Sequence, residues 1–370
     1  MKTILLLGLS LIGAPQDPAS HLKAEMAAAR KAGIPVTSQE MATFCAVPDA
    51  QNAGLEYKKL FSLTETRGLL DKRAPAPEGI LDSFRKASAR LHKKETPAEI
   101  RQGKAELKAI EPVLELARRA AAKPRCDFGW SSKGMGMNFP HMATLKALVR
   151  CLCYEATQRN AEGNGQAALA DLSVAARTCA HQAEDPSQIS ALVVLSLNAI
   201  VDRTLHEVIK GHEHDGKFLA EAQNTYALLP IPNLRRALYG ELYQNLSIVE
   251  VAKDPSHAPS EITAMRAAAG SPALTKATPK EMRELQEQGA ETIYGFRKLI
   301  AALPSDPADI SAIKASTTRT WDQLKRDPAF KNPLLKEALD VSEFVKAIER
   351  SLNTRRTTEA YLKSLAADAH

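Results

Sequence analysis

Residues 145–180, LKALVRCLCYEATQRNAEGNGQAALADLSVAARTCA, decide the fold. Leu145, Leu148 and Leu152 recur at the three- and four-residue spacing of one helix face. Gly163-Asn164-Gly165 then interrupts the pattern, because glycine weakens a helix interior and favours a turn. A second apolar face at helical spacing follows, formed by Ala168, Leu172, Ala175 and Cys179. The stretch therefore predicts two helices that pack as an antiparallel hairpin.

Helix boundaries recur on both sides of this hairpin. Thr96-Pro97-Ala98-Glu99 and Thr278-Pro279-Lys280-Glu281 both have the form of a capping box with proline at the first helical position. Residues 215–229 and 233–252 predict a further helix pair, separated by Pro230-Ile231-Pro232. No stretch alternates strictly enough to predict a strand. We therefore predict an all-α fold, an irregular α-solenoid-like array of helical hairpins.

The composition agrees with a helical globular protein and argues against a nucleic-acid partner. Apolar residues make up 44% of the chain and aromatic residues 5%, so Ala, Leu, Ile and Val must form the core. The net charge of +6 comes from interleaved charges of both signs, which is typical of a solvated helix surface. Arg350, Arg355 and Arg356 cluster near the C-terminus, and we interpret them as a solvated face rather than a phosphate site.

The first residues have the pattern of a secretory signal peptide. Lys2 precedes the apolar run of residues 4–12, and Gly13-Ala14 offers small residues for cleavage. We expect residues 1–14 to be removed and the protein to be periplasmic or secreted, with no transmembrane segment in the mature chain. The alternative is a buried N-terminal helix, which Pro15 and Pro18 would interrupt.

The mature chain divides at a segment rich in proline, alanine and serine. We predict a helical-hairpin body at residues 20–253, a linker at 254–279 and a C-terminal helical unit at 280–370. Within the body, residues 189–201 are apolar nearly all round, which predicts a helix buried on most sides.

Residues 152–180 resemble a tetratricopeptide repeat. The similarity rests on Ala156, Gly163, Ala168, Leu172 and Ala175, whereas Pro186 comes about six residues later than the family's proline. The resemblance covers one repeat and implies tetratricopeptide-like helix pairing. By analogy it favours a protein or peptide partner bound along a groove between hairpins.

A second resemblance involves residues 47–57. Pro48, Asn52, Ala53 and Tyr57 form P-x-x-x-N-A-x-x-x-Y, which resembles a motif near the start of certain uncharacterised exported bacterial proteins. Those proteins are all-helical and carry a tryptophan-containing loop, to which Trp130 is similar. The resemblance implies fold and export, and no activity.

The loop at residues 123–141 holds the candidate ligand-binding residues Asp127, Trp130 and His141. Long loops in compact domains are often functional, and aromatic side chains beside polar ones can line a pocket. In the alternative interpretation, Phe128 and Trp130 only anchor the loop to the core. A small-molecule binder or hydrolase using this loop is our second hypothesis for the function.

The histidines and cysteines offer weaker candidates. His206, His212 and His214 lack the rigid spacing of a metal site, so we interpret them as a solvated turn. Cys151 and Cys179 are equidistant from the hairpin turn, which makes them a candidate disulfide, although small buried residues are the alternative. Cys153 lies on the apolar stripe of its helix better than Cys151 does, so Cys179 packs against Cys151 or, as the alternative, against Cys153. No catalytic, metal or cofactor motif is present. We therefore expect no cofactor, and a non-enzymatic, exported scaffold that binds a protein or peptide.

Overall fold

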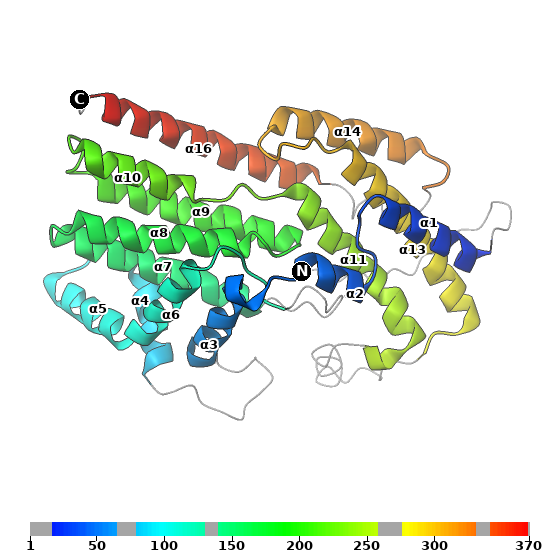
Figure 1. The fold of residues 1–370 in the computed structure, drawn as a ribbon, viewed down its shortest axis with the longest axis horizontal. Coiled ribbons are helices and arrows are strands. Elements are labelled where there is room, and N and C mark those ends of the chain that lie inside the picture. The colour runs from blue at the N-terminus through cyan, green and yellow to red at the C-terminus, as the bar shows by residue number, and fades with distance from the viewer. Residues whose placement is uncertain (1–16, 65–78, 130–139, 258–275, 331–340, 369–370) are drawn as a thin grey trace. The chain divides into compact units, whose positions relative to one another are not determined.

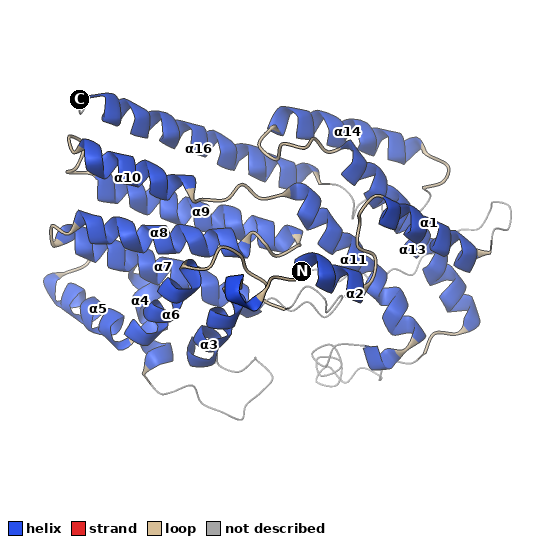
Figure 2. Cartoon of the chain, viewed as in Figure 1, coloured by secondary structure: helices blue, strands red, loops and turns tan. Residues whose placement is uncertain are grey.

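The computed structural model describes residues 17–64, 79–129, 140–257, 276–330 and 341–368 (Figure 1). These residues form fourteen α-helices and two short 3-10 helices, which confirms the predicted all-α class. Within the described ranges, the one extended pairing is an isolated bridge between Asn52 and Arg125, and no strand occurs (Figure 2). The predicted signal peptide, Trp130 and most of the predicted linker lie outside these residues.

The chain forms two compact units, each made from segments that are separate in the sequence. The first unit comprises Met1–Phe44, Ser132–Met137 and Leu238–Val345. The second unit comprises Cys45–Ser131, Asn138–Ala237 and Lys346–His370. All the candidate residues placed by the structure belong to the second unit.

The first unit packs long helices around a glycine. Gly289 lies on α13, and a Cβ atom there would stand 3.3 Å from Leu22 on α1 and 3.5 Å from Val249 on α11. The three helices therefore approach closely at this point. Glu25 on α1 and Arg297 on α13 add an ion pair of 3.0 Å. The helices of this unit are α1 (Pro18–Lys31), α2 (Ser38–Cys45), most of α11 (Leu234–Lys253), α13 (Pro279–Ala302) and α14 (Ile310–Arg326).

The second unit contains the hairpin predicted from residues 145–180. Helices α7 (Pro140–Ala161) and α8 (Gly165–Gln182) pack along each other, with Asn164 capping α8 through a 3.1 Å bond from Ala167 N (Figure 1). Gly163 adopts a φ of 80°, which favours glycine. The other helices are α3 (Gly54–Thr64), α4 (Ile80–Arg90), α5 (Pro97–Ala109), α6 (Glu111–Ala121), α9 (Gln188–Ile209), α10 (Gly216–Ala227) and α16 (Ser342–Asp368), from Lys346 onward.

Both predicted capping boxes are confirmed. The Thr96 and Thr278 side chains accept from the amides of Glu99 and Glu281, whose carboxylates accept from the amides of the threonines. These bonds satisfy helix-end donors that have no partner within the helix. The helices α5 and α13 therefore begin where the sequence predicts.

Helix α9 differs from its prediction as a helix buried on most sides. Val194, Leu197 and Val201 are buried, but Ile189 and Leu192 are 44% and 45% exposed. An all-round apolar pattern permits burial on every side, yet Ile189, Leu192, Ser196 and Ala199 of α9 remain exposed while α7 and α8 cover other parts of the helix. Among the described residues, α9 is also the one helix with the length and apolar composition to cross a membrane.

Candidate functional site

Asp127, the first candidate in the loop at residues 123–141, closes its own turn. Its Oδ1 accepts from Gly129 N at 2.7 Å, and Gly129 has a φ of 74°. Its backbone N–H donates to Asn52 Oδ1 at 2.9 Å, so Asn52 of the 47–57 motif holds the loop. The Asp127 carboxylate therefore has a local structural partner.

His141 pairs with a carboxylate that the sequence analysis did not assign to it. Its Nε2 lies 2.6 Å from Asp185 Oδ2, and its ring stacks on Phe128 with centroids 4.6 Å apart. The His141 side chain is fully buried. Asp127 and His141 thus belong to different contacts, while Phe128 anchors the loop to the core as in the alternative interpretation.

A buried polar network continues from Asp185 to the start of α9. Gln182 Nε2 donates to Asp185 Oδ2 at 3.3 Å, and Ser190 Oγ donates to the Gln182 carbonyl at 2.9 Å. Ser187 caps α9 by accepting from Ser190 N at 3.0 Å. Because His141, Gln182 and Ser190 have no exposed surface, this network fixes the α8–α9 connection and offers no access to a ligand through the described residues.

The candidate histidines of the 206–214 cluster have separate neighbours. His206 lies 3.1 Å from Thr358 Oγ1 and stacks on Tyr361. His212 stacks on Phe218 with centroids 4.1 Å apart. Within the described part of the chain, no group of three His, Cys, Asp or Glu residues has the arrangement of a metal site.

The cysteines are free and buried, so the candidate Cys151–Cys179 disulfide is not formed in the structure. Cys151 faces α4, where its Sγ donates to the Phe84 carbonyl at 3.5 Å. Cys153 hydrogen-bonds with Thr204 on α9, and burial, followed by the nearby Cys153, raises the pKa of Cys179. The prediction rested on equal depth in the hairpin, whereas the thiol of Cys151 has its hydrogen-bond partner on α4.

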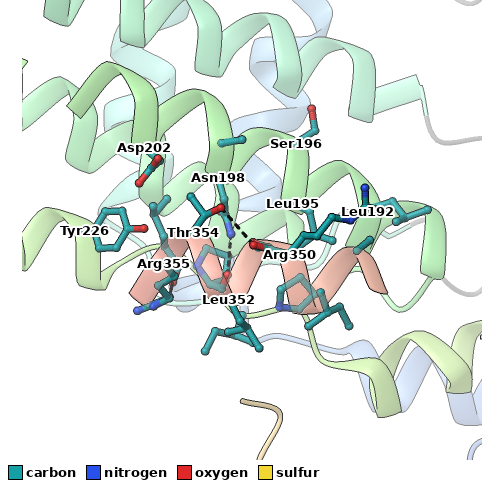
Figure 3. Close-up of a pocket in the computed structure, with 18 residues that line it drawn as sticks. Leu192, Leu195, Ser196, Asn198, Asp202, Tyr226, Arg350, Leu352, Thr354 and Arg355 are labelled. Atoms are coloured by element: carbon teal, nitrogen blue, oxygen red, sulfur yellow. Dashed lines mark hydrogen bonds between the residues drawn. The ribbon is translucent and has the colours of Figure 1, made fainter. Parts of the chain in front are cut away.

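The second unit also contains a groove that the sequence analysis missed. It encloses about 380 Å³ between α9, the segment from Leu229 to Pro232, and α16 (Figure 3). Its apolar lining consists of Leu192, Leu195, Ala199, Leu229, Pro230, Ile231, Pro232, Ala347, Ile348 and Leu352. We call this surface the α9–α16 groove.

Side chains of the two helices hold the floor of the groove in place. Asn198 Nδ2 donates to the Pro230 carbonyl at 2.8 Å, and Arg355 Nη1 donates to the Leu229 carbonyl at 2.6 Å. The prolines at 230 and 232 lack an N–H and cannot continue α10 as a helix. The carbonyls of the interrupted backbone are therefore satisfied by the walls of the groove.

Charges at the Tyr226 end of the groove are paired within the protein. Asp202 Oδ1 accepts from Thr358 at 2.8 Å, and Arg355 pairs with Glu359 at 2.9 Å. The Arg355 guanidinium also lies over the Tyr226 ring, 5.8 Å from its centroid. Burial and the nearby Asp202 raise the pKa of Tyr226 above its usual range, so its hydroxyl stays protonated.

The opposite end of the groove carries an uncompensated arginine. Arg350 lies near Leu192 (Figure 3), and its side chain donates only to the Lys346 carbonyl of its own helix, at 3.4 Å. Within the described residues it forms no ion pair. Of the arginines that the sequence analysis assigned to a solvated face, Arg350 and Arg355 line the groove and Arg356 does not.

No family model, curated protein or solved structure matches this chain.

Proposed function

We propose that the protein is an exported, non-enzymatic helical scaffold that binds a segment of a protein partner in the α9–α16 groove. The observation that carries the proposal is the exposure of Ile189 and Leu192 beside this groove, since they are the large apolar side chains exposed among the described residues. Apolar surface next to a concave site is typical of protein interaction surfaces.

Further support comes from the hairpin and from the N-terminal sequence. The α7–α8 pair has the tetratricopeptide-like spacing described above, and that family binds peptides along grooves between helices. Export rests on the signal-like pattern of residues 1–14. A small-molecule binder or hydrolase built on the loop at residues 123–141 has less support, because His141 is fully buried and Asp127 closes its own turn.

Site-specific photocrosslinking tests this function. A photoreactive phenylalanine analogue replaces Leu192 or Ser196 beside the groove, or Ala220 on the exposed face of α10 as the matched control. We expect one adduct of the same mass from positions 192 and 196 and none from position 220. Adding Leu195→Asp to the groove variants should abolish that adduct.

Equal crosslinking at position 220, or an adduct that persists with Leu195→Asp, would show that the groove is not the binding surface. The absence of any adduct from positions 192 and 196 would also contradict the proposal.

A further inference from the structure

We propose that the occupant of the α9–α16 groove is an amphipathic helix of the partner, and that an acidic side chain on this helix pairs with Arg350. The inference rests on the proposed function and adds the conformation and charge of the partner segment.

The walls of the groove suit a third helix. Asp202 on α9 bonds Thr358 on α16, and one turn further His206 stacks on Tyr361, so the two helices run side by side in the same direction. From Leu192 to Asp202, α9 rises about 15 Å, which matches about three turns of a bound helix.

The exposed face of α9 is shaped for close helix contact. Ile189, Leu192, Ser196 and Ala199 are all exposed and lie three or four residues apart, so they form one stripe along the helix. The two large side chains come first, and the two small ones follow. A partner helix can insert an apolar side chain over Ser196 and Ala199, in the way that ridges pack into grooves.

The backbone of the groove disfavours an extended peptide. Both walls are helices, whose N–H and C=O groups are already bonded within the helix. The floor contains Pro230 and Pro232, which have no N–H, and the carbonyls of Leu229 and Pro230 already accept from Arg355 and Asn198. An extended peptide would lose backbone hydrogen bonds to water, whereas a helix carries its own.

The positive charge of Arg350, unpaired among the described residues, favours an acidic residue on the partner helix. The second arginine of the groove, Arg355, is committed to Glu359 and the Leu229 carbonyl, while Arg350 has no carboxylate partner among the described residues. An Asp or Glu on the flank of the bound helix would supply that partner. A charge-assisted arginine–carboxylate bond is stronger than a neutral one and fixes the register of the helix.

A peptide selection tests the inference directly. The full chain is used to select binders from a displayed library of 14-residue peptides with randomised positions, and affinities of the selected peptides are measured by fluorescence anisotropy. We expect enriched sequences with apolar residues three and four apart and an acidic residue on one flank. Exchanging that residue for its amide should weaken binding about tenfold, and a central proline should abolish it.

Charge exchange assigns the contact to one arginine. Arg350→Glu should weaken the acidic peptide by tenfold or more, and a peptide with Lys in place of the acid should regain affinity for that variant. Arg356→Glu makes the same charge change on an exposed residue of α16 outside the groove lining, so it should leave the affinity within twofold.

Several outcomes would overturn the inference. These are a selection without groove-dependent binders, binders that tolerate the central proline, equal affinity of the acid and amide peptides, or no effect of Arg350→Glu. If crosslinking at positions 192 and 196 succeeds while these outcomes occur, the proposed function stands and only the helical, acidic partner is wrong.

Discussion

The hydroxyl of Tyr57 on α3 lies 3.0 Å from Nδ1 of His181 on α8, and both side chains have no exposed surface. His181 Nε2 lies 2.9 Å from the Lys123 carbonyl, which can only accept, so Nε2 carries the proton and Nδ1 accepts from Tyr57. Tyr57, the last residue of the 47–57 motif, thus fixes the tautomer of buried His181. Through this histidine it links α3, α8 and the segment after α6.

Removal of this hydroxyl should destabilise the protein. Tyr57→Phe leaves Nδ1 of His181 buried without its donor, which costs about 1–3 kcal/mol of unfolding free energy. Urea unfolding followed by circular dichroism measures the change. Tyr361→Phe is the matched control, because the Tyr361 hydroxyl makes no hydrogen bond to the described residues and only its ring packs, on His206. Equal losses in both variants would refute the role of the Tyr57–His181 bond.

His181 also makes the stability depend on pH. Burial lowers the pKa of His181 to about 4, against a value near 6.5 for an unfolded chain. Between pH 6.5 and 4, the His181 imidazole is therefore protonated in the unfolded state but not in the folded state. The unfolding free energy falls as the pH drops from about 6.5 to 4. We expect His181→Gln to flatten this part of the profile of unfolding free energy against pH. An unchanged slope would contradict a buried neutral histidine.

Asp171 acts in the opposite sense. Burial and the neighbouring Glu155 raise the pKa of Asp171 to about 7, although Arg159 Nε lies 3.0 Å away and Arg118 Nη2 lies 3.7 Å away. The folded protein keeps a proton that the unfolded chain loses near pH 4, so this group lowers stability as the pH rises from about 4 to 7.

Asp171→Asn therefore removes a carboxyl group that is protonated in the folded state, rather than a strong ion pair with Arg159 and Arg118. Between pH 4 and 7, the unfolding free energy of the variant should rise with pH more steeply than that of the wild type. The variant should therefore be most stable, compared with the wild type, at pH 8. Thermal unfolding across this pH range provides the measurement, with Asp82→Asn on the exposed face of α4 as control. A large loss confined to pH 8 would mean that the arginines outweigh burial.

Turns and helix starts could be predicted from the sequence because they depend on neighbouring residues. The turn at Gly163-Asn164-Gly165 and the capping boxes at Thr96 and Thr278 were predicted because their residues are contiguous. Burial of α9 was predicted wrongly, because hydropathy does not show which faces find a neighbour. Ile189 and Leu192 remain exposed for this reason.

The candidate sites depended on distant residues, which no local pattern reveals. His141 meets Asp185, 44 positions away, rather than Asp127 in its own loop. The groove forms where α9 and α16 meet, although their lining residues lie about 150 positions apart. One local signal of the groove was present in the sequence. Pro230-Ile231-Pro232 interrupts the helices, so the backbone carbonyls in and next to it need hydrogen-bond donors from other parts of the chain.

At Gly54, the backbone of α3 lies directly against the backbone of Asp127 in the loop after α6. A Cβ atom at this position would stand 2.1 Å from the Asp127 carbonyl oxygen, and the loop backbone cannot rotate away as a side chain would. We expect Gly54→Ala to cost more than about 2 kcal/mol and to release the Asn52–Asp127 contact. Gly33→Ala is the comparison, since its φ of 72° brings backbone strain with no neighbouring atom within 4 Å. Hydrogen exchange of the Asp127 amide separates the two, because only Gly54→Ala should increase it.

The last prediction concerns the thiols. The reactive form of cysteine is the thiolate, and burial raises the pKa of Cys153 to about 12 and that of Cys179 well above its usual value. Together with the hydrogen bond from Cys151 to the Phe84 carbonyl on α4, this should keep the hairpin cysteines reduced even in an oxidising compartment. The native protein, isolated without reductant, should react negligibly with dithionitrobenzoate, and the same sample in guanidinium should titrate all five thiols. Three thiols in guanidinium would show that one disulfide forms, and peptide mapping would then reveal whether it joins Cys151 to Cys179.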